Sequence, residues 1–202
     1  GISPKLEGEE MKVSEDGFKG GDRTKIDLPQ VQSEMLRKLH EAGKKVVFIN
    51  CSGGAMALKT EEPYCDAILQ GWYLGESGGQ ALAEVLYGKV NPSGKLPVTF
   101  YNSTDELPDF LDYSMRNRTY RYFNGEPLYP FGYGLSYTSF TLSKPEYKDA
   151  FVDVSITNTG MMDGDEVVQV YIKRLADTEG PLKTLKGFKK VSLKAGETSL
   201  VS

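Results

Sequence analysis

The sequence predicts an α/β domain, built on a largely parallel sheet with helices on both faces, followed by an all-β sandwich. Two observations carry this prediction. Between residues 27 and 100, short apolar runs alternate with longer amphipathic segments, as in consecutive βαβ units. After residue 150, apolar residues instead recur at every second position between polar turns, which is typical of β-sandwiches. We place the boundary so that the two parts are residues 1–140 and 141–202.

The first predicted element is a helix that begins at Asp27 and ends near Gly43. Asp27 is a favourable N-cap, Gln30 occupies the capping-box position three residues later, and Pro29 is tolerated in the first turn. The apolar residues of this segment fall on one helical face: Val31, Met35, Leu36 and Leu39.

The alternation continues with strands at residues 46–49, 67–70 and 96–100 and a helix at 81–87. The run at 46–49 is uniformly apolar, as expected for a buried strand of a parallel sheet. Residues 50–54 then form the turn at its carboxyl end, the edge of an open α/β sheet where ligands bind.

From residue 102 to 137 the pattern breaks into prolines, glycines and aromatics, with many tyrosines from Tyr113 onward. A tyrosine has an apolar face and a polar tip, which suits carbohydrate or a domain interface; packing at the edge of a core explains any single tyrosine equally well. Strand patterns follow at residues 151–157, 166–172 and 185–191. These are too few strands for two sheets, so we expect a sandwich that is truncated at Ser202.

Composition and charge exclude several classes of partner. The chain has 24 basic and 28 acidic residues and a net charge of −4, without long blocks of either sign. This balance favours neither nucleic acid nor an anionic membrane as a partner. The longest candidate for a membrane span, residues 46–49, has only the length of a strand. The chain begins without Met and without a signal peptide, so we expect it to be a piece of a larger protein.

Three carboxylates near the start are candidates for acid–base chemistry: Glu7, Glu9 and Glu10. Like charges so close together raise one another's pKa, and a cleft that buries a sugar raises it further, as a general acid requires. An acidic loop that is simply exposed to solvent would show the same pattern of glutamates, so the sequence alone leaves both interpretations open. Asp22 and Arg23 place a carboxylate beside a guanidinium in a glycine-rich loop. The alternatives to a functional role are an ion pair within the loop and a segment that leads into the helix.

Other catalytic chemistries lack the residues they need. His40 is the only histidine, which leaves little basis for a Ser-His-Asp triad, a Cys-His pair or a histidine-rich metal site. The two cysteines, Cys51 and Cys65, lack metal-site spacing. The glycine-rich loop at residues 75–79 can direct backbone N–H groups toward an anion or a sugar hydroxyl, but it is not a nucleotide motif. We expect no cofactor and no metal, and any hydrolysis would use carboxylates.

Several motifs follow one another in a characteristic order: LEGEE at residues 6–10, GDRT at 21–24 with DLP at 27–29, NPSGKLP at 91–97, RTYRY at 118–122 and LYPFGYGLSY at 128–137. Together they resemble the C-terminal half of glycoside hydrolase family 3 β-glycosidases, in the β-xylosidase and β-glucosidase branches. The tail, with TNTG at 157–160, GDEVVQ at 164–169 and LKGF at 185–188, resembles the fibronectin-type-III-like domain that follows in many members.

The resemblance implies a retaining, exo-acting hydrolase of β-xylosides or β-glucosides. In such enzymes an N-terminal barrel, absent from this chain, supplies an Asp nucleophile, and a loop near the start of the α/β domain supplies the general acid/base. That role falls on Glu9, with Glu7 and Glu10 as alternatives. Glu7, Glu10, Asp22 and Arg23 are then candidates for binding a β-linked oligosaccharide. A periplasmic or secreted location is also implied.

Two departures from the family pattern and two rival functions remain at this stage. The first strand of the α/β domain is expected before Gly1, so its sheet would need residues outside this chain or have an exposed edge. Leu74 replaces a proline that relatives often carry.

A non-catalytic module for carbohydrate binding or domain packing is the main rival, because one carboxylate cannot complete a double displacement. A lyase or phosphorylase variant is the other.

Overall fold

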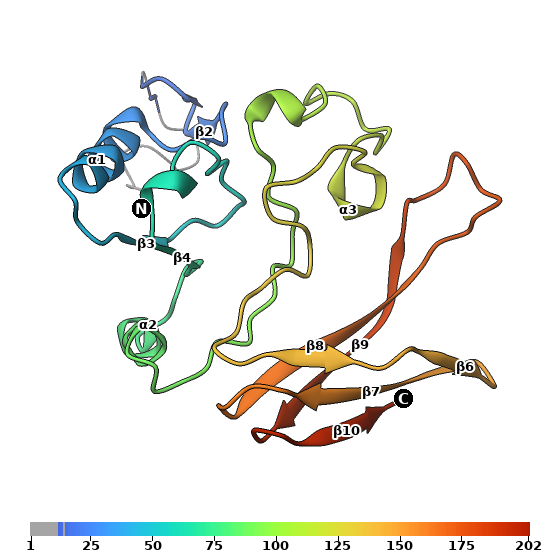
Figure 1. Ribbon diagram of the computed structural model, residues 1–202. Helices are drawn as coiled ribbons and strands as arrows, with labels where there is room; N and C mark the ends of the chain where they lie inside the picture. Colours follow the sequence, from blue (N-terminus) through green and yellow to red (C-terminus); the bar gives the residue numbers. More distant parts are fainter. Residues whose placement is uncertain (1–11, 14) are drawn as a thin grey trace. The chain divides into compact units, whose positions relative to one another are not determined.

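The computed structural model describes residues 12–13 and 15–202 of the chain (Figure 1). These residues form two compact units that are interleaved in the sequence. Unit 1 contains the chain up to Gly78, then Val98–Arg118 and Asn124–Pro130. Unit 2 contains Gly79–Pro97, Thr119–Phe123 and Phe131–Ser202.

Unit 1 begins with a small hairpin. Strand β1 (Phe18–Lys19) pairs antiparallel with β2 (Asp22–Arg23). The two residues of the turn, Gly20 and Gly21, have φ values of +62° and +90°, a backbone conformation that glycine adopts without steric cost and that two-residue hairpin turns favour.

Helix α1 (Gln30–Glu41) confirms the predicted helix, but the predicted cap is wrong. Its N-cap residue is Pro29, with no side-chain cap. Asp27 is engaged elsewhere: its carboxylate accepts a hydrogen bond from Thr104 Oγ1 at 3.0 Å, and its backbone bridges to Ala57. A tertiary contact therefore outcompetes the local capping interaction. At the other end, Gly43 with φ of +68° follows the helix, as is common after a helix C-terminus.

The parallel strand pair was predicted correctly. Strands β3 (Val47–Asn50) and β4 (Ala67–Gln70) pair in parallel from Val47 opposite Ala67 to Asn50 opposite Gln70. A 3₁₀ turn, η1 (Glu62–Tyr64), lies in the connection between them. Among the described residues this parallel sheet has two strands.

The predicted strand at residues 96–100 is wrong. Only an isolated antiparallel bridge forms there, in which the N–H of Phe100 donates to Tyr129 O at 2.9 Å and the N–H of Tyr129 donates back at 3.3 Å. Pro97 has no N–H to donate, which works against a continuous ladder in this segment. The same stretch of unit 1 holds a second 3₁₀ turn, η2 (Thr104–Glu106).

Unit 2 combines two helices with a β-sandwich. Helix α2 (Gly78–Leu86) ends before Gly88, which has φ of +68°, and α3 (Thr119–Tyr122) is a single turn. One sheet has β7 (Phe151–Asn158) at its centre, paired with β5 (Phe140–Leu142), β6 (Glu146–Lys148) and β10 (Thr198–Val201). The other sheet pairs β8 (Gly164–Ile172) with β9 (Thr184–Leu193).

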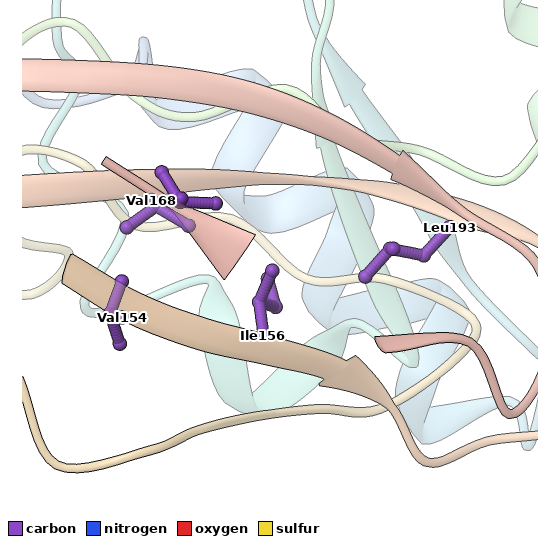
Figure 2. Packing of buried hydrophobic residues seen from close by; sticks show 5 residues of the cluster. Val154, Ile156, Val168 and Leu193 are labelled. Atoms are coloured by element: carbon purple, nitrogen blue, oxygen red, sulfur yellow. The ribbon is translucent and has the colours of Figure 1, made fainter. Parts of the chain in front are cut away.

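The three long sandwich strands confirm the sequence patterns, whereas the expectation of too few strands for two sheets is wrong. The core of unit 2 draws on both sheets, as Figure 2 shows for Val154 and Ile156 from β7, Val168 from β8 and Leu193 from β9. Val201 of β10 completes this cluster, and Ile156 is fully buried. Alternate residues of each strand thus face one interior, as the period-two pattern predicts.

Candidate functional site

The three carboxylates Glu7, Glu9 and Glu10 lie outside the described residues. Of the other candidates, Asp22 and Arg23 lie together on β2, where successive side chains point to opposite faces. The guanidinium of Arg23 lies over the ring of Phe18, 5.1 Å from its centroid, which is within the range of a cation–π contact. Asp22 is exposed, and its backbone lies opposite that of Lys19 in the register of the hairpin.

The carboxyl ends of β3 and β4 meet at one edge, where a buried polar network fixes the following turn. The amide of Asn50 donates to Ser52 Oγ at 3.0 Å and to Gln70 Oε1 at 2.7 Å. Ser52 Oγ donates to Gly54 O at 2.8 Å, and Gln70 Nε2 donates to Ser52 O at 3.2 Å. Asn50 and Ser52 are 3% and 4% exposed. Buried polar groups that satisfy one another in this way hold a single conformation, so this turn is a rigid base.

Two aromatic residues follow β4 at the same edge. Trp72 has φ of +54°, a left-handed conformation that non-glycine residues rarely adopt, and its ring packs edge-on against buried Phe100, with centroids 6.3 Å apart. Tyr73 is 65% exposed, and its ring lies directly over Gly53, where an added Cβ would come within 2.6 Å of Cε2. The edge therefore presents one exposed tyrosine above a buried polar network.

Electrostatic effects in unit 1 concentrate around the connection between β3 and β4. Burial raises the pKa of the Cys65 thiol, and the nearby carboxylates of Glu61 and Asp66 raise it further. Hydrogen bonds from Lys45 Nζ at 2.7 Å and from the Val46 N–H at 2.8 Å lower the pKa of Asp66. The raised thiol pKa disfavours the thiolate, the nucleophilic form of cysteine, at neutral pH.

The tyrosine-rich segment serves two purposes. Tyr120 stacks on Phe131 with centroids 4.3 Å apart and accepts a hydrogen bond from the N–H of Leu185 on its hydroxyl, so it packs within unit 2. Phe110 and Tyr113 of unit 1, in contrast, are 86% and 82% exposed. Core packing thus explains Tyr120, while the exposed pair remains open to a partner.

No group of three or more His, Cys, Asp or Glu side chains that could hold a metal ion occurs within residues 12–13 and 15–202. In the same part of the chain, no helix has both the length and the apolar character that crossing a membrane requires.

Comparison with known families assigns the two parts of the chain. Residues 2–137 match the model of the glycosyl hydrolase family 3 C-terminal domain, and residues 166–202 match the fibronectin type III-like domain. The chain therefore belongs to glycoside hydrolase family 3 and carries its C-terminal domain. This confirms the resemblance that the ordered motifs indicated.

Individual relatives agree with this assignment. A xylan 1,4-beta-xylosidase of Xylanibacter ruminicola is 54% identical over 98% of this chain, and a periplasmic beta-glucosidase of Salmonella typhimurium is 43% identical over 89%. A crystal structure of a beta-glucosidase from Kluyveromyces marxianus matches with a TM-score of 0.80 at 37% identity, covering 90% of this chain and 24% of that one. The chain spans about a quarter of the length of the two named relatives, 24% and 26%.

The polar turn after β3 could be predicted from the sequence, whereas the roles of the two aromatics after β4 could not. A positive φ is signalled in sequence by glycine or asparagine, and a tryptophan carries no such signal. The close approach of Tyr73 to Gly53 is a contact between two loops. Its one signal in the sequence is the glycine pair at residues 53–54, since a residue without a Cβ permits such an approach.

Proposed function

We propose that this chain is the C-terminal part of a retaining, exo-acting β-glycosidase that hydrolyses β-xylosides or β-glucosides. The observation that carries the proposal is the 54% identity to a xylan 1,4-beta-xylosidase across 98% of the chain. Similarity to a periplasmic beta-glucosidase keeps glucosides open as substrates. The same relative, whose name places it in the periplasm, supports a periplasmic or secreted location.

The proposed chemistry is a double displacement by two carboxyl groups. A retaining glycosidase places them roughly 5–5.5 Å apart across the scissile bond, so that one attacks carbon while the other protonates the leaving oxygen. We assign the acid/base role to Glu9 and the nucleophile to an Asp of an N-terminal barrel that this chain does not include. Glu7, Glu10, Asp22 and Arg23 are the proposed contacts to a β-linked oligosaccharide. No metal or cofactor enters the proposed reaction.

The proposal includes an α/β domain over residues 1–140 whose sheet gains a first strand from the full-length polypeptide, with helices on both faces. Two features support it. In the part of the chain that the structure describes, β3 pairs only with β4. On α1, three apolar side chains at four-residue spacing are exposed: Val31 by 73%, Met35 by 53% and Leu39 by 40%. Side chains four residues apart share one helical face, and an exposed apolar face of this kind marks a surface that another element covers. Residues 141–202 form the second domain in this proposal.

The test is Glu9→Gln in the full-length protein, assayed on an activated aryl β-glycoside and on a β-linked disaccharide, each with and without azide. Loss of the proton donor should reduce the disaccharide rate most, because the aryl leaving group needs little protonation. Azide should rescue deglycosylation, because it attacks the anomeric carbon of the glycosyl-enzyme without a general base and releases the nucleophilic carboxylate and a glycosyl azide. Glu7→Gln and Glu10→Gln, assayed in the same way, test the two alternative acid/base residues of the same loop. Normal turnover of both substrates by Glu9→Gln would show that the assignment is wrong.

A second candidate function, a non-catalytic module for carbohydrate binding or domain packing, is favoured for the isolated chain by its exposed aromatics, Phe110 and Tyr113. The chain as given would contain one of the two carboxylates and is expected to be inactive alone. Assaying the chain beside the full-length protein on the aryl glycoside separates the candidates: activity only in the full-length protein supports the glycosidase, and inactivity of both supports the module.

A further inference from the structure

Residues 106–117 of unit 1 form a loop, here the aromatic loop, whose two ends are joined. The side-chain amide of Asn117 donates to Glu106 O at 3.3 Å. The carboxylate of Glu106 accepts from the N–H of Asn102 at 2.7 Å and from the side-chain amide of Asn102 at 3.0 Å. The same amide also donates to Glu126 O at 2.7 Å. These bonds fix the base of the loop, and closed surface loops of this size are frequently functional.

Hydrogen bonds within the aromatic loop also shape its tip. The N–H of Asp112 donates to Asp109 O at 2.9 Å, which closes a turn with Phe110 and Leu111 at its two central positions. The guanidinium of Arg118 donates to Asp109 O at 2.7 Å and to Asp112 O at 3.0 Å. One side chain therefore links both ends of the turn and holds its two central residues at the tip.

Three large side chains at this tip are exposed. Phe110, Leu111 and Tyr113 are 86%, 75% and 82% exposed. Single exposed apolar residues are common at protein surfaces, whereas several within four positions of a shaped loop indicate a binding surface. A fixed backbone suits such a surface, because a loop that is already ordered loses little conformational freedom on binding.

The carboxylates beside these side chains favour a sugar over a protein as the ligand. Asp109 and Asp112 stand at the two ends of the turn. Hydrogen bonds from the hydroxyl and the N–H of Ser114 lower the pKa of Asp112, so this carboxylate stays ionised at neutral pH. The core of a protein interface is depleted in Asp and Glu, because burying an unpaired carboxylate is costly. A neutral sugar instead offers C–H faces to aromatic rings and hydroxyl donors to carboxylates, each of which has about four acceptor positions.

We propose that the aromatic loop binds a neutral, β-linked polysaccharide. The rings of Phe110 and Tyr113 lie against the sugars, and the carboxylates of Asp109 and Asp112 accept hydrogen bonds from the sugar hydroxyls. The inference rests on the proposed function, which supplies the class of sugar. It goes beyond that function, because the contact holds the polymer whether or not a glycosidic bond is cleaved.

The experiment is native electrophoresis of this chain in gels with increasing amounts of soluble arabinoxylan or mixed-linkage β-glucan. The chain alone is expected to be inactive, so slower migration in these gels reports binding and not hydrolysis. Phe110→Ala and Tyr113→Ala should each raise the dissociation constant about tenfold, the loss of one good contact. Phe110→Tyr, which keeps a ring, should lose less. Tyr147→Ala is the matched control, since Tyr147 on β6 is 78% exposed, and it should migrate as the wild type does.

Equal migration with and without polysaccharide, or equal retardation of the wild type and both alanine variants, would overturn the inference. The same gels are then run with the full-length protein. Retardation of this chain but not of the full-length protein would show that other parts of the polypeptide cover the loop, and this result also overturns the inference. A full-length protein that binds through these residues but hydrolyses neither a β-xyloside nor a β-glucoside would contradict the proposed function instead, while the inference would stand.

Discussion

The β-sandwich and helix α1 both carry clear apolar patterns, but only the sandwich packs five buried apolar side chains into one cluster within the described chain. Ile156 of β7 is fully buried, with Val154 and Val168 6% exposed beside it. On α1, Leu36 is 3% exposed whereas Val31 is 73% exposed. An apolar face on a helix or strand predicts that its side chains are buried, but it does not specify which element covers them. Within the described residues the sandwich strands bury apolar side chains against one another, while Val31, Met35 and Leu39 of α1 stay exposed.

Buried polar groups show the same difference between the two units. Asn158 of unit 2 is fully buried with four hydrogen bonds: it accepts from Thr138 Oγ1 and the Gly160 N–H, and donates to the carbonyls of Met162 and Leu193. Glu61 of unit 1 is 3% exposed; one carboxylate oxygen accepts from Ser33 Oγ, and Oε2 has no partner among the described residues. A buried carboxylate oxygen without a donor is costly, so Glu61 is less well satisfied than Asn158.

The largest effect is expected in the sandwich core. Ile156→Ala should lower the free energy of unfolding by about 3 kcal/mol, since it removes three buried carbons and leaves a cavity between the sheets. Urea unfolding followed by far-UV circular dichroism measures it. Leu142→Ala on β5 is the control, because Leu142 is 57% exposed, and it should change the midpoint little. Equal costs for both substitutions would contradict the view that the sandwich has a complete core.

The sequence predicts the elements whose patterns are long. Strands β7, β8 and β9 have eight to ten residues each, so their alternation is clear. Strands β5, β6 and β10 have three or four residues, too few for a periodic signal, and missing them led to the wrong expectation about two sheets. Of the predicted parallel sheet, one strand pair, β3 with β4, is present in the described residues.

Local rules failed where a distant contact decided the outcome. Asp27 has the right identity for a helix cap, yet Thr104 binds its carboxylate. The candidate site shows both outcomes. The polar turn after β3 could be predicted, because strand order alone places it at the carboxyl edge of the sheet. The placement of Tyr73 depends on the left-handed Trp72 and on the contact with Gly53, and neither is encoded in a local pattern.

The exposed face of α1 gives the second prediction. Val31→Ala in this chain should change the free energy of unfolding by less than about 0.5 kcal/mol, because Val31 is 73% exposed and alanine favours helix. In the full-length protein the same substitution should cost about 1.5 kcal/mol, the transfer free energy of two methyl groups that another element covers. Urea unfolding of unit 1 can be followed by the fluorescence of Trp72, the only tryptophan.

Leu36→Ala is the matched control on the same helix, since Leu36 is 3% exposed and should be costly in both proteins. If Val31→Ala costs equally little in both, the face of α1 stays exposed in the full-length protein, and the proposed covering element is wrong.

The smallest effect concerns an ion pair on the surface of the β8–β9 sheet. Asp165 binds Lys190 Nζ at 2.8 Å, and this hydrogen bond, with one from Ser192, lowers the pKa of the carboxyl. A carboxyl whose pKa is lower in the folded state stabilises the fold above its unfolded pKa of about 3.9, and this contribution is lost as the pH falls through the folded pKa. Asp165→Asn should therefore reduce stability at pH 7, by at most about 1 kcal/mol for so exposed a pair, and should match the wild type near pH 2. Urea midpoints at the two pH values measure this, and Lys190→Met should remove the larger part of the same pH dependence, since the hydrogen bond from Ser192 remains. A deficit in Asp165→Asn that is equal at both pH values would mean that packing around β8, rather than the charge of Asp165, accounts for it.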